Sequence, residues 1–201
     1  MARTNAEMSE TTRRELLQRA RAAFAEHGYN EAPIETVVRA AGMTKGALYH
    51  HFGSKQGLFL AVVRDVAEQI AASVGARLSG APTKAKFLRA CGDYLQATLA
   101  PDVRRILLID APAVLDAAAA QQLEDELGVA LLRNALIALE SAGELPAGDI
   151  EAQANALNGA LNGVALWAAH HQAPAAAVRR GMKVLAQWLD GGNGSEATKT
   201  A

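Results

Sequence analysis

Cysteine is nearly absent from this 201-residue sequence, which contains only Cys91. A single cysteine cannot form an intramolecular disulfide. The first residues also lack the basic, apolar and small-residue order of a signal peptide, and no apolar run reaches the roughly 18 residues that span a bilayer. We therefore expect a protein that is soluble and intracellular.

Aromatic residues, at 4%, and prolines, of which there are 6, are also scarce, whereas half of the residues are apolar, with many alanines and leucines. This composition favours helices that pack closely on one another, and it predicts an all-α fold. The net charge of −1 gives no reason to expect a polyanion as partner. However, residues 1–60 carry a slight positive excess, which points this end of the chain toward a negatively charged partner.

Signatures of catalysis and of metal binding are missing as well. The sequence contains no H-x-x-x-H, paired-cysteine or glycine-rich phosphate-binding pattern. His170 and His171 are adjacent, so on a helix they diverge by about 100° and cannot bind one metal ion together. Cys91 could serve as a redox sensor, but a lone cysteine among alanines is more typical of a small buried residue. We expect no catalytic residue, no metal and no cofactor.

A helical pattern begins close to the amino terminus. Residues 1–10 show no apolar periodicity, which predicts a flexible arm. Thr12 and Glu15 match the Ser/Thr-x-x-Glu capping box, which predicts that the first helix begins at Thr12. Gly28 can adopt the left-handed conformation that ends a helix. Pro33 suits the first position of a second helix, because its missing N–H would have no partner there.

The stretch AGMTKGALYHHFGSKQGLF, at residues 41–59, predicts a tight turn followed by a short helix. Gly42 closes the second helix, and Thr44 can cap a third helix that runs to about Phe52. Two short helices joined by a glycine-containing turn form a helix-turn-helix, whose second helix enters the major groove of DNA. Ala47, Leu48 and Phe52 can face the core. The residues expected to point outward, toward a DNA edge, are Lys45, Gly46, Tyr49 and His50.

Nearby donors add to this pattern. Tyr49 and His51 offer neutral donors, and Lys55 offers a cation in the first turn of the next helix. A lysine there opposes the helix dipole, and a nearby phosphate would explain its position. From spacing alone, an ordinary pair of helices whose polar residues are merely solvated explains the pattern equally well.

Two stretches and the spacing between them resemble the DNA-binding domain of the tetracycline-repressor (TetR) family of bacterial regulators. These stretches are TTRRELLQRARAAFAEHGY and VVRAAGMTKGALYHHFGSKQGLF, and the resemblance covers residues 12 to about 60 without a gap. It implies a cytoplasmic homodimer, associated with the nucleoid when bound, whose two recognition helices read a palindromic operator in double-stranded DNA. It also implies a larger helical carboxy-terminal domain that binds a ligand and dimerises.

The resemblance also assigns roles to single positions. In such proteins the positions matching Lys45, Gly46 and His50 approach base edges. The positions that usually touch phosphates match Thr12, Thr44, Tyr49, His51 and Lys55. This chain departs from the family at Ala32, followed by Pro33, where the family commonly has a Thr or Ser cap for helix two. The missing side-chain acceptor costs about 1 kcal/mol, and any phosphate contact by that hydroxyl is absent.

Beyond residue 60 the sequence predicts a series of helices. A fourth helix continues from Ser54 to about Leu78, and SGAPT at 79–83 breaks it. Further helices are predicted over 84–99, 102–109, 118–141, 149–171 and 175–190, with breaks at Pro101, Pro112, AGELPAGD and Pro174. The predicted organisation is a flexible arm (1–10), a helix-turn-helix DNA-binding domain (11–57), a helical ligand-binding and dimerisation domain (58–190) and a disordered tail (191–201).

Gly159 and Gly163 lie four residues apart on one face of a predicted helix. Glycine inside a helix costs about 1 kcal/mol relative to alanine, so its repetition predicts a close helix approach. That approach can be a crossing within the chain or a contact between two subunits. In the TetR family the final pair of helices meets its twin in a four-helix bundle, so the resemblance favours the dimer interface.

The ligand-contact candidates are larger or polar side chains on helices expected to surround a cavity, although each also suits an ordinary core or interface position. They are Phe87, Cys91, Tyr94, Asn158, Trp167 and His170. Few aromatics among many alanines would leave room for a mostly apolar pocket, which predicts a small apolar or aromatic ligand. We expect a repressor released from DNA by this ligand. The alternatives are a ligand-independent architectural or division-linked DNA-binding protein and a helical interaction module that binds no specific DNA.

Overall fold

The computed structural model describes residues 5–191, which form helices joined by turns without any strand in this range. The all-α prediction is confirmed. The chain divides into two compact units: the first holds the residues up to Glu68 together with Ala100–Ala120, and the second holds Gln69–Leu99 and the residues from Gln121 onward. The functional division predicted at residues 57 and 58 stays a prediction. Residues 1–4 of the predicted arm and 192–201 of the predicted tail lie outside the described residues.

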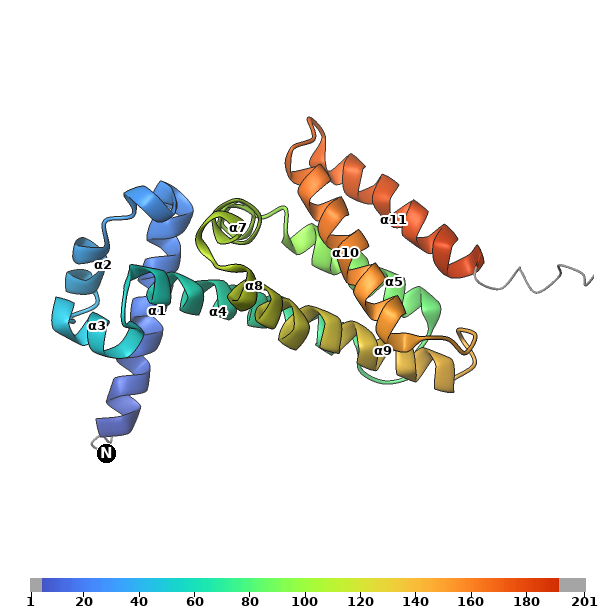
Figure 1. Ribbon diagram of the computed structural model, residues 1–201, viewed down its shortest axis with the longest axis horizontal. Coiled ribbons are helices and arrows are strands. Elements are labelled where there is room, and N and C mark those ends of the chain that lie inside the picture. The colour runs from blue at the N-terminus through green and yellow to red at the C-terminus, as the bar shows by residue number, and fades with distance from the viewer. Residues whose placement is uncertain (1–4, 192–201) are drawn as a thin grey trace, which may run out of the picture. The chain divides into compact units, whose positions relative to one another are not determined.

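The first unit begins with the helices expected of a helix-turn-helix (Figure 1). These are α1 (Asn5–Glu31), α2 (Ile34–Ala40), α3 (Lys45–Phe52) and the first part of α4 (Lys55–Leu78). Leu16 and Phe24 of α1 are fully buried, and the ring of Phe24 meets that of Phe59 in α4 edge-on at 4.9 Å. This aromatic contact fixes α4 against α1 within the unit.

The start of α1 differs from the prediction. The helix begins at Asn5, so Thr12 lies inside it and is not its cap, and residues 5–10 are helical. The segment NAEMSET contains neither proline nor glycine, so nothing in it stops the helix from continuing past the capping-box pattern. Gly28 adopts the expected positive φ of 73° near the end of α1. Pro33 precedes α2 and does not open it.

The part of the first unit that comes from later in the chain is helical throughout most of its length. It contains α6 (Pro101–Val103), the π-helical segment η1 (Arg104–Asp110) and α7 (Ala111–Val114). The break predicted at Pro112 is wrong, because this proline lies in the first turn of α7, where a missing N–H costs little. The helix ends instead at Leu115, whose backbone is extended.

The second unit is a set of packed helices, and Figure 1 shows α10 beside α11. It contains the end of α4, then α5 (Lys84–Ala97), the π-helical segment η2 (Glu124–Val129), α9 (Ala130–Ser141), α10 (Ile150–Ala169) and α11 (Pro174–Gly191); α8 (Ala117–Leu123) leads into it. α10 packs against α9 and α11, and α11 packs against α5. Phe87, Leu95, Leu136 and Ala165 are among its most buried side chains.

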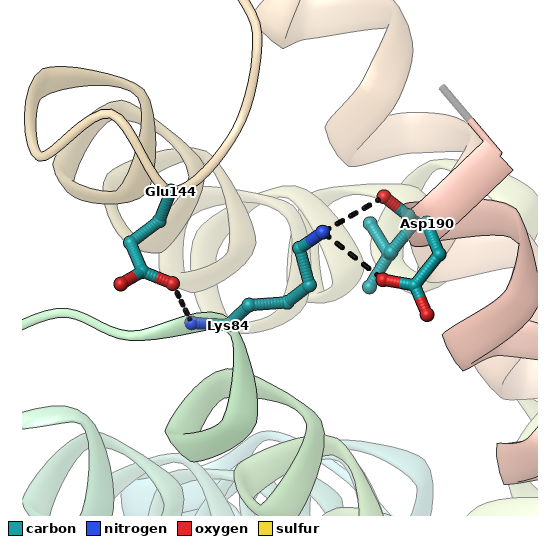
Figure 2. A network of polar contacts seen from close by, with 4 residues as sticks. Lys84, Glu144 and Asp190 are labelled. Carbon is teal, nitrogen blue, oxygen red and sulfur yellow. Dashed lines mark hydrogen bonds and ion pairs between the residues drawn. The ribbon is translucent and has the colours of Figure 1, made fainter. Parts of the chain in front are cut away.

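Lys84 joins three segments of the second unit (Figure 2). Its backbone N–H donates to Glu144 Oε2 at 2.9 Å, in the turn after α9. Its Nζ donates to Leu189 O at 3.3 Å and to Asp190 Oδ1 at 3.1 Å, at the carboxy-terminal end of α11. A cation is favourable there because the last carbonyls of a helix carry partial negative charge. These contacts hold the start of α5 against the end of α11.

Candidate nucleic-acid interface

Helix α3 has well-defined ends. Thr44 has an extended backbone, and its Oγ1 accepts a hydrogen bond from the Ala47 N–H at 3.1 Å. The predicted N-cap is therefore confirmed. At the other end Gly53 has a φ of 73° and its N–H donates to Tyr49 O at 2.9 Å. Such capping makes a helix of only eight residues sufficiently defined to present side chains in fixed positions.

On the inner face of α3, Leu48 is buried in the core of the first unit, while Ala47 and Phe52, also predicted to face the core, are half-buried. The residues that the structure leaves exposed on α3 are Lys45, Gly46, Tyr49, His50 and His51. Their orientation toward solvent makes them accessible to a DNA surface, while their contacts with bases and phosphates stay predictions.

Lys45, predicted to read a base, has a partner in the preceding helix. Its Nζ donates to Glu35 Oε1 of α2 at 2.7 Å, although both side chains are largely exposed. This hydrogen bond and the attraction between the charges lower the pKa of Glu35 and raise the pKa of Lys45. The sequence analysis did not identify Glu35. Its position in the first turn of α2, close to the predicted DNA contacts, is the feature that could have identified it.

Lys55 also contacts the protein itself. Its Nζ donates to Asn30 O at 2.9 Å and to Ala32 O at 3.3 Å, and it lies 5.2 Å from the centre of the Tyr29 ring. Lys55 therefore binds carbonyl groups at the end of α1 and in the turn before α2, which explains a lysine in the first turn of α4 without a phosphate. Thr12 is half-buried on α1. The phosphate contacts assigned to these two residues stay predictions.

Two carboxylates from the later segment anchor α1. Asp102 Oδ2 accepts from Arg21 Nη2 at 2.7 Å. Asp110, a buried carboxylate, accepts from the Tyr29 N–H at 2.9 Å and forms an ion pair with Arg105 at 3.1 Å. The sequence analysis missed these contacts because their partners lie about 80 positions apart along the chain. They attach η1 and its neighbours to the helix that supports α2 and α3.

Among the ligand candidates, Phe87 and Cys91 are core residues of α5. Burial raises the pKa of the Cys91 thiol to about 12. The thiol is therefore protonated at neutral pH, and the reactive thiolate that a redox sensor requires is scarce. These properties match the small buried residue predicted as the alternative for Cys91.

Tyr94 and Asn158 belong to one polar cluster, which we define as Tyr94, Glu124, Asn158 and Asn162. Tyr94 Oη donates to Asn162 Oδ1 at 2.7 Å, while Asn158 Nδ2 and Asn162 Nδ2 lie 3.3 and 3.5 Å from the two oxygens of Glu124. Burial, and then the charge of Glu124, raise the pKa of Tyr94 to about 12. The π-helical segment η2 brings Gly128 so close to Asn158 that a β-carbon would crowd its side chain. Tyr94 and Asn158, two of the predicted ligand contacts, therefore lie in the same polar cluster.

Trp167 lies on the exposed side of α10, and His170, which is also exposed, follows the last residue of this helix. Trp167 is 41% exposed, its ring meets that of His171 edge-on at 5.3 Å, and the Arg180 guanidinium lies 5.2 Å from its centre. His170 Nδ1 is 2.9 Å from Leu166 O one turn earlier. Their exposure separates these two candidates from the buried pair Phe87 and Cys91.

An exposed apolar stripe follows α10 and continues on α11. We call it the outer face and define it as Gly159, Gly163, Leu166, Trp167, Val184 and Trp188. The alternative that Gly159 and Gly163 mark a tight crossing within the chain is wrong, because a β-carbon at either position would meet no described atom within 4 Å. The close crossing of α10 and α11 lies instead at Gly181, against Val164.

Residues 5–191 contain neither a cluster of metal-binding side chains nor a membrane-spanning helix. No three or more His, Cys, Asp or Glu side chains in this range are grouped as a metal site requires. Within the same range, every helix is too short or too polar to cross a membrane.

Both parts of the chain match known sequence families. The family described as "Bacterial regulatory proteins, tetR family" matches residues 16–62. The family described as "Tetracyclin repressor-like, C-terminal domain" matches residues 84–192. The second match alone covers more than half of the chain. The chain belongs to the TetR family of transcriptional regulators. It is therefore a DNA-binding regulator and not an enzyme, and the capped α3 is the second helix of its helix-turn-helix.

Three comparisons illustrate where the similarity lies. The transcriptional repressor AcnR of Corynebacterium efficiens is 46% identical over 63 residues, which cover 31% of this chain and 34% of AcnR. This match therefore spans only about a third of that relative. A TetR-family regulator from Pectobacterium atrosepticum is 33% identical with a TM-score of 0.77, covering 94% of this chain and 97% of that one. Bacillus subtilis FadR, solved with stearoyl-CoA, has a TM-score of 0.69 at 14% identity, covering 86% and 97%, and shares the fold.

Proposed function

We propose that this chain is a homodimeric repressor that binds a palindromic operator through α3 and is released by a small molecule bound in the second unit. The observation that carries the DNA-binding half is the capped α3, which buries Leu48 and exposes Lys45, Tyr49 and His50. In a dimer two such helices meet successive major-groove faces when they lie about 34 to 36 Å apart. The expected location is the cytoplasm, on the nucleoid when operator is bound.

The outer face supports the homodimer. Trp188 is 65% exposed and Leu166 is 46% exposed, although both are large apolar residues. A contiguous group of exposed apolar residues marks an interaction site. Gly159 and Gly163 leave the backbone of α10 open to a close partner, and a second copy of α10 and α11 is the partner that completes a four-helix bundle.

The polar cluster supports a ligand site in the second unit. Buried aromatic and apolar side chains of α5 lie on the same helix as Tyr94, whose hydroxyl is held by Asn162. Ligand sites in proteins are mostly apolar, with a few polar groups that orient the ligand. The ligand we propose is small and mainly apolar or aromatic, with at least one hydrogen-bonding group. FadR, which shares the fold, was solved in complex with stearoyl-CoA, a ligand that carries an apolar acyl chain.

Release would be a shift between two populations. α4 contributes residues to both units without interruption, so a ligand that favours a different position of its second half changes the placement of α3. Changing the protein from mostly bound to mostly released requires affinities for the ligand that differ by up to about 10⁴-fold between the two states. By linkage, operator binding must weaken ligand binding by the same factor that ligand weakens operator binding.

The test begins with DNA. Duplexes selected from a random pool by the protein should contain an inverted repeat, and a scrambled duplex of the same composition should bind at least about 10³-fold more weakly. Compounds that raise the melting temperature are then added at saturation to the operator complex. Failure to select any repeat contradicts the repressor proposal. Selection of a repeat whose affinity no binding compound changes supports the ligand-independent alternative.

A further inference from the structure

The ion pair between Lys45 and Glu35 places a negative charge next to a residue that is proposed to read DNA. Glu35 lies in the first turn of α2, and Lys45 is the first residue of α3. Both side chains are more than 60% exposed, so neither is needed to fill the core. An exposed pair of this kind contributes little to stability, so we consider its effect on DNA binding.

A carboxylate at this position is unfavourable for binding DNA in general. Nonspecific affinity comes from lysines and arginines that neutralise phosphates and release counterions. Glu35 offsets the charge of Lys45, because the phosphates repel its carboxylate while they attract the ammonium group. The same hydrogen bond is the largest cause of the lowered pKa of Glu35 and the raised pKa of Lys45, so both groups stay ionised around neutral pH.

The hydrogen-bonding capacity of Lys45 is only partly used by this pair. An ammonium group has three donors, and the structure assigns one of them to Glu35 Oε1 at 2.7 Å. Two donors remain, the number needed for the O6 and N7 acceptors of a guanine in the major groove. Glu35 also limits the conformations of a flexible side chain before DNA arrives, which reduces the ordering cost of a base contact.

We propose that Glu35 is a specificity-determining residue that positions Lys45 for a base edge and suppresses its attraction to phosphates. The inference rests on the proposed DNA-reading role of α3. Glu35 makes no base contact in this scheme and acts through Lys45. It therefore lowers nonspecific affinity more than operator affinity, and the ratio between the two rises.

The experiment compares Glu35→Gln with wild type on two duplexes, one selected from a random pool by the wild-type protein and one scrambled. Glu26→Gln is the control, because Glu26 is on α1 of the same unit and its side chain is as exposed as that of Glu35, at 75%. For Glu35→Gln we expect stronger binding to scrambled DNA, with a salt dependence steeper by about one unit per subunit. The preference for the selected duplex should fall by about fivefold, the lower end of what one good side-chain contact to a base provides.

The Lys45→Met background decides whether Glu35 acts through Lys45. There, adding Glu35→Gln should leave the preference ratio unchanged. An equal fall in that ratio with and without Lys45 overturns the positioning role, since Glu35 would then contact DNA independently. An unchanged ratio in the single variant, or the same change in Glu26→Gln, overturns it as well. If wild type shows no preference for any selected duplex, the DNA-reading proposal itself fails, and this outcome differs from all the others.

Discussion

Gly181 of α11 lies directly against the side chain of Val164 in α10, and a β-carbon at position 181 would overlap the valine methyl groups. The two last helices therefore depend on a hydrogen atom at this position for their spacing. Valine has few rotamers available in a helix, so its side chain cannot easily turn away. This contact is within one subunit, unlike the contact proposed for the two glycines earlier in α10.

We expect Gly181→Ala to lower the free energy of unfolding by about 1 to 3 kcal/mol, because the added methyl group forces α10 and α11 apart. Gly92→Ala, in α5, is the matched control, since a β-carbon there meets no described atom within 4 Å. That substitution should stabilise the protein by up to about 1 kcal/mol through helix propensity. Urea unfolding followed by circular dichroism measures both. Equal effects would mean that the crossing at Gly181 is looser than described.

Gly163→Leu should separate the subunits and leave each subunit folded. Position 163 is open within the chain, so a leucine there has room in the monomer but blocks a close approach by a second α10. Sedimentation at micromolar concentration should show a monomer with unchanged helical content. A folded dimer would place Gly163 outside the interface. Because Trp167 and Trp188 lie on the outer face, their fluorescence should change with dissociation.

Cys91 should resist alkylation in the folded protein. With a pKa of about 12, its thiolate at pH 8 is about 10³-fold scarcer than that of a thiol at the ordinary value near 9. The raised pKa means that burial favours the protonated thiol. Its contribution to stability is therefore complete below pH 9, and it falls as the unfolded thiol ionises between about pH 9 and 12. The check is the rate of iodoacetamide labelling at pH 8, native and in urea. Equal rates would contradict the described burial.

Lys55→Met separates the two roles available to Lys55. Loss of the hydrogen bonds to Asn30 O and Ala32 O should lower stability by about 1 to 2 kcal/mol. If Lys55 also contacts a phosphate, binding to operator and scrambled DNA should weaken alike, and the salt dependence should decrease by about one unit per subunit. An unchanged salt dependence together with lower stability would leave Lys55 with its structural role alone.

The sequence was most informative where structure depends on neighbours along the chain. Thr44 capping, the end of α3 at Phe52 and the burial of Leu48 follow from local chemistry, and they were predicted correctly. The capping-box pattern at Thr12 was misleading because the residues before it also favour a helix. Contacts between residues on different helices could not be predicted from local patterns. No residue near Glu35 in the sequence indicates that Lys45 is its partner, and no residue near Tyr94 indicates Asn162. The same limit applies to Gly181, whose need for a small residue comes from Val164 on another helix.

The first unit is discontinuous in sequence, since Ala100–Ala120 belongs to it along with the residues up to Glu68. Asp102 and Asp110, which hold Arg21 and the Tyr29 N–H, lie in that second piece. A hybrid regulator made by joining residues 1–68 of this chain to the sensor half of a relative would therefore replace the supports of its own DNA-binding helices. Exchanging Ala100–Ala120 together with the amino-terminal residues keeps those supports, so these two segments together form the transferable DNA-binding module.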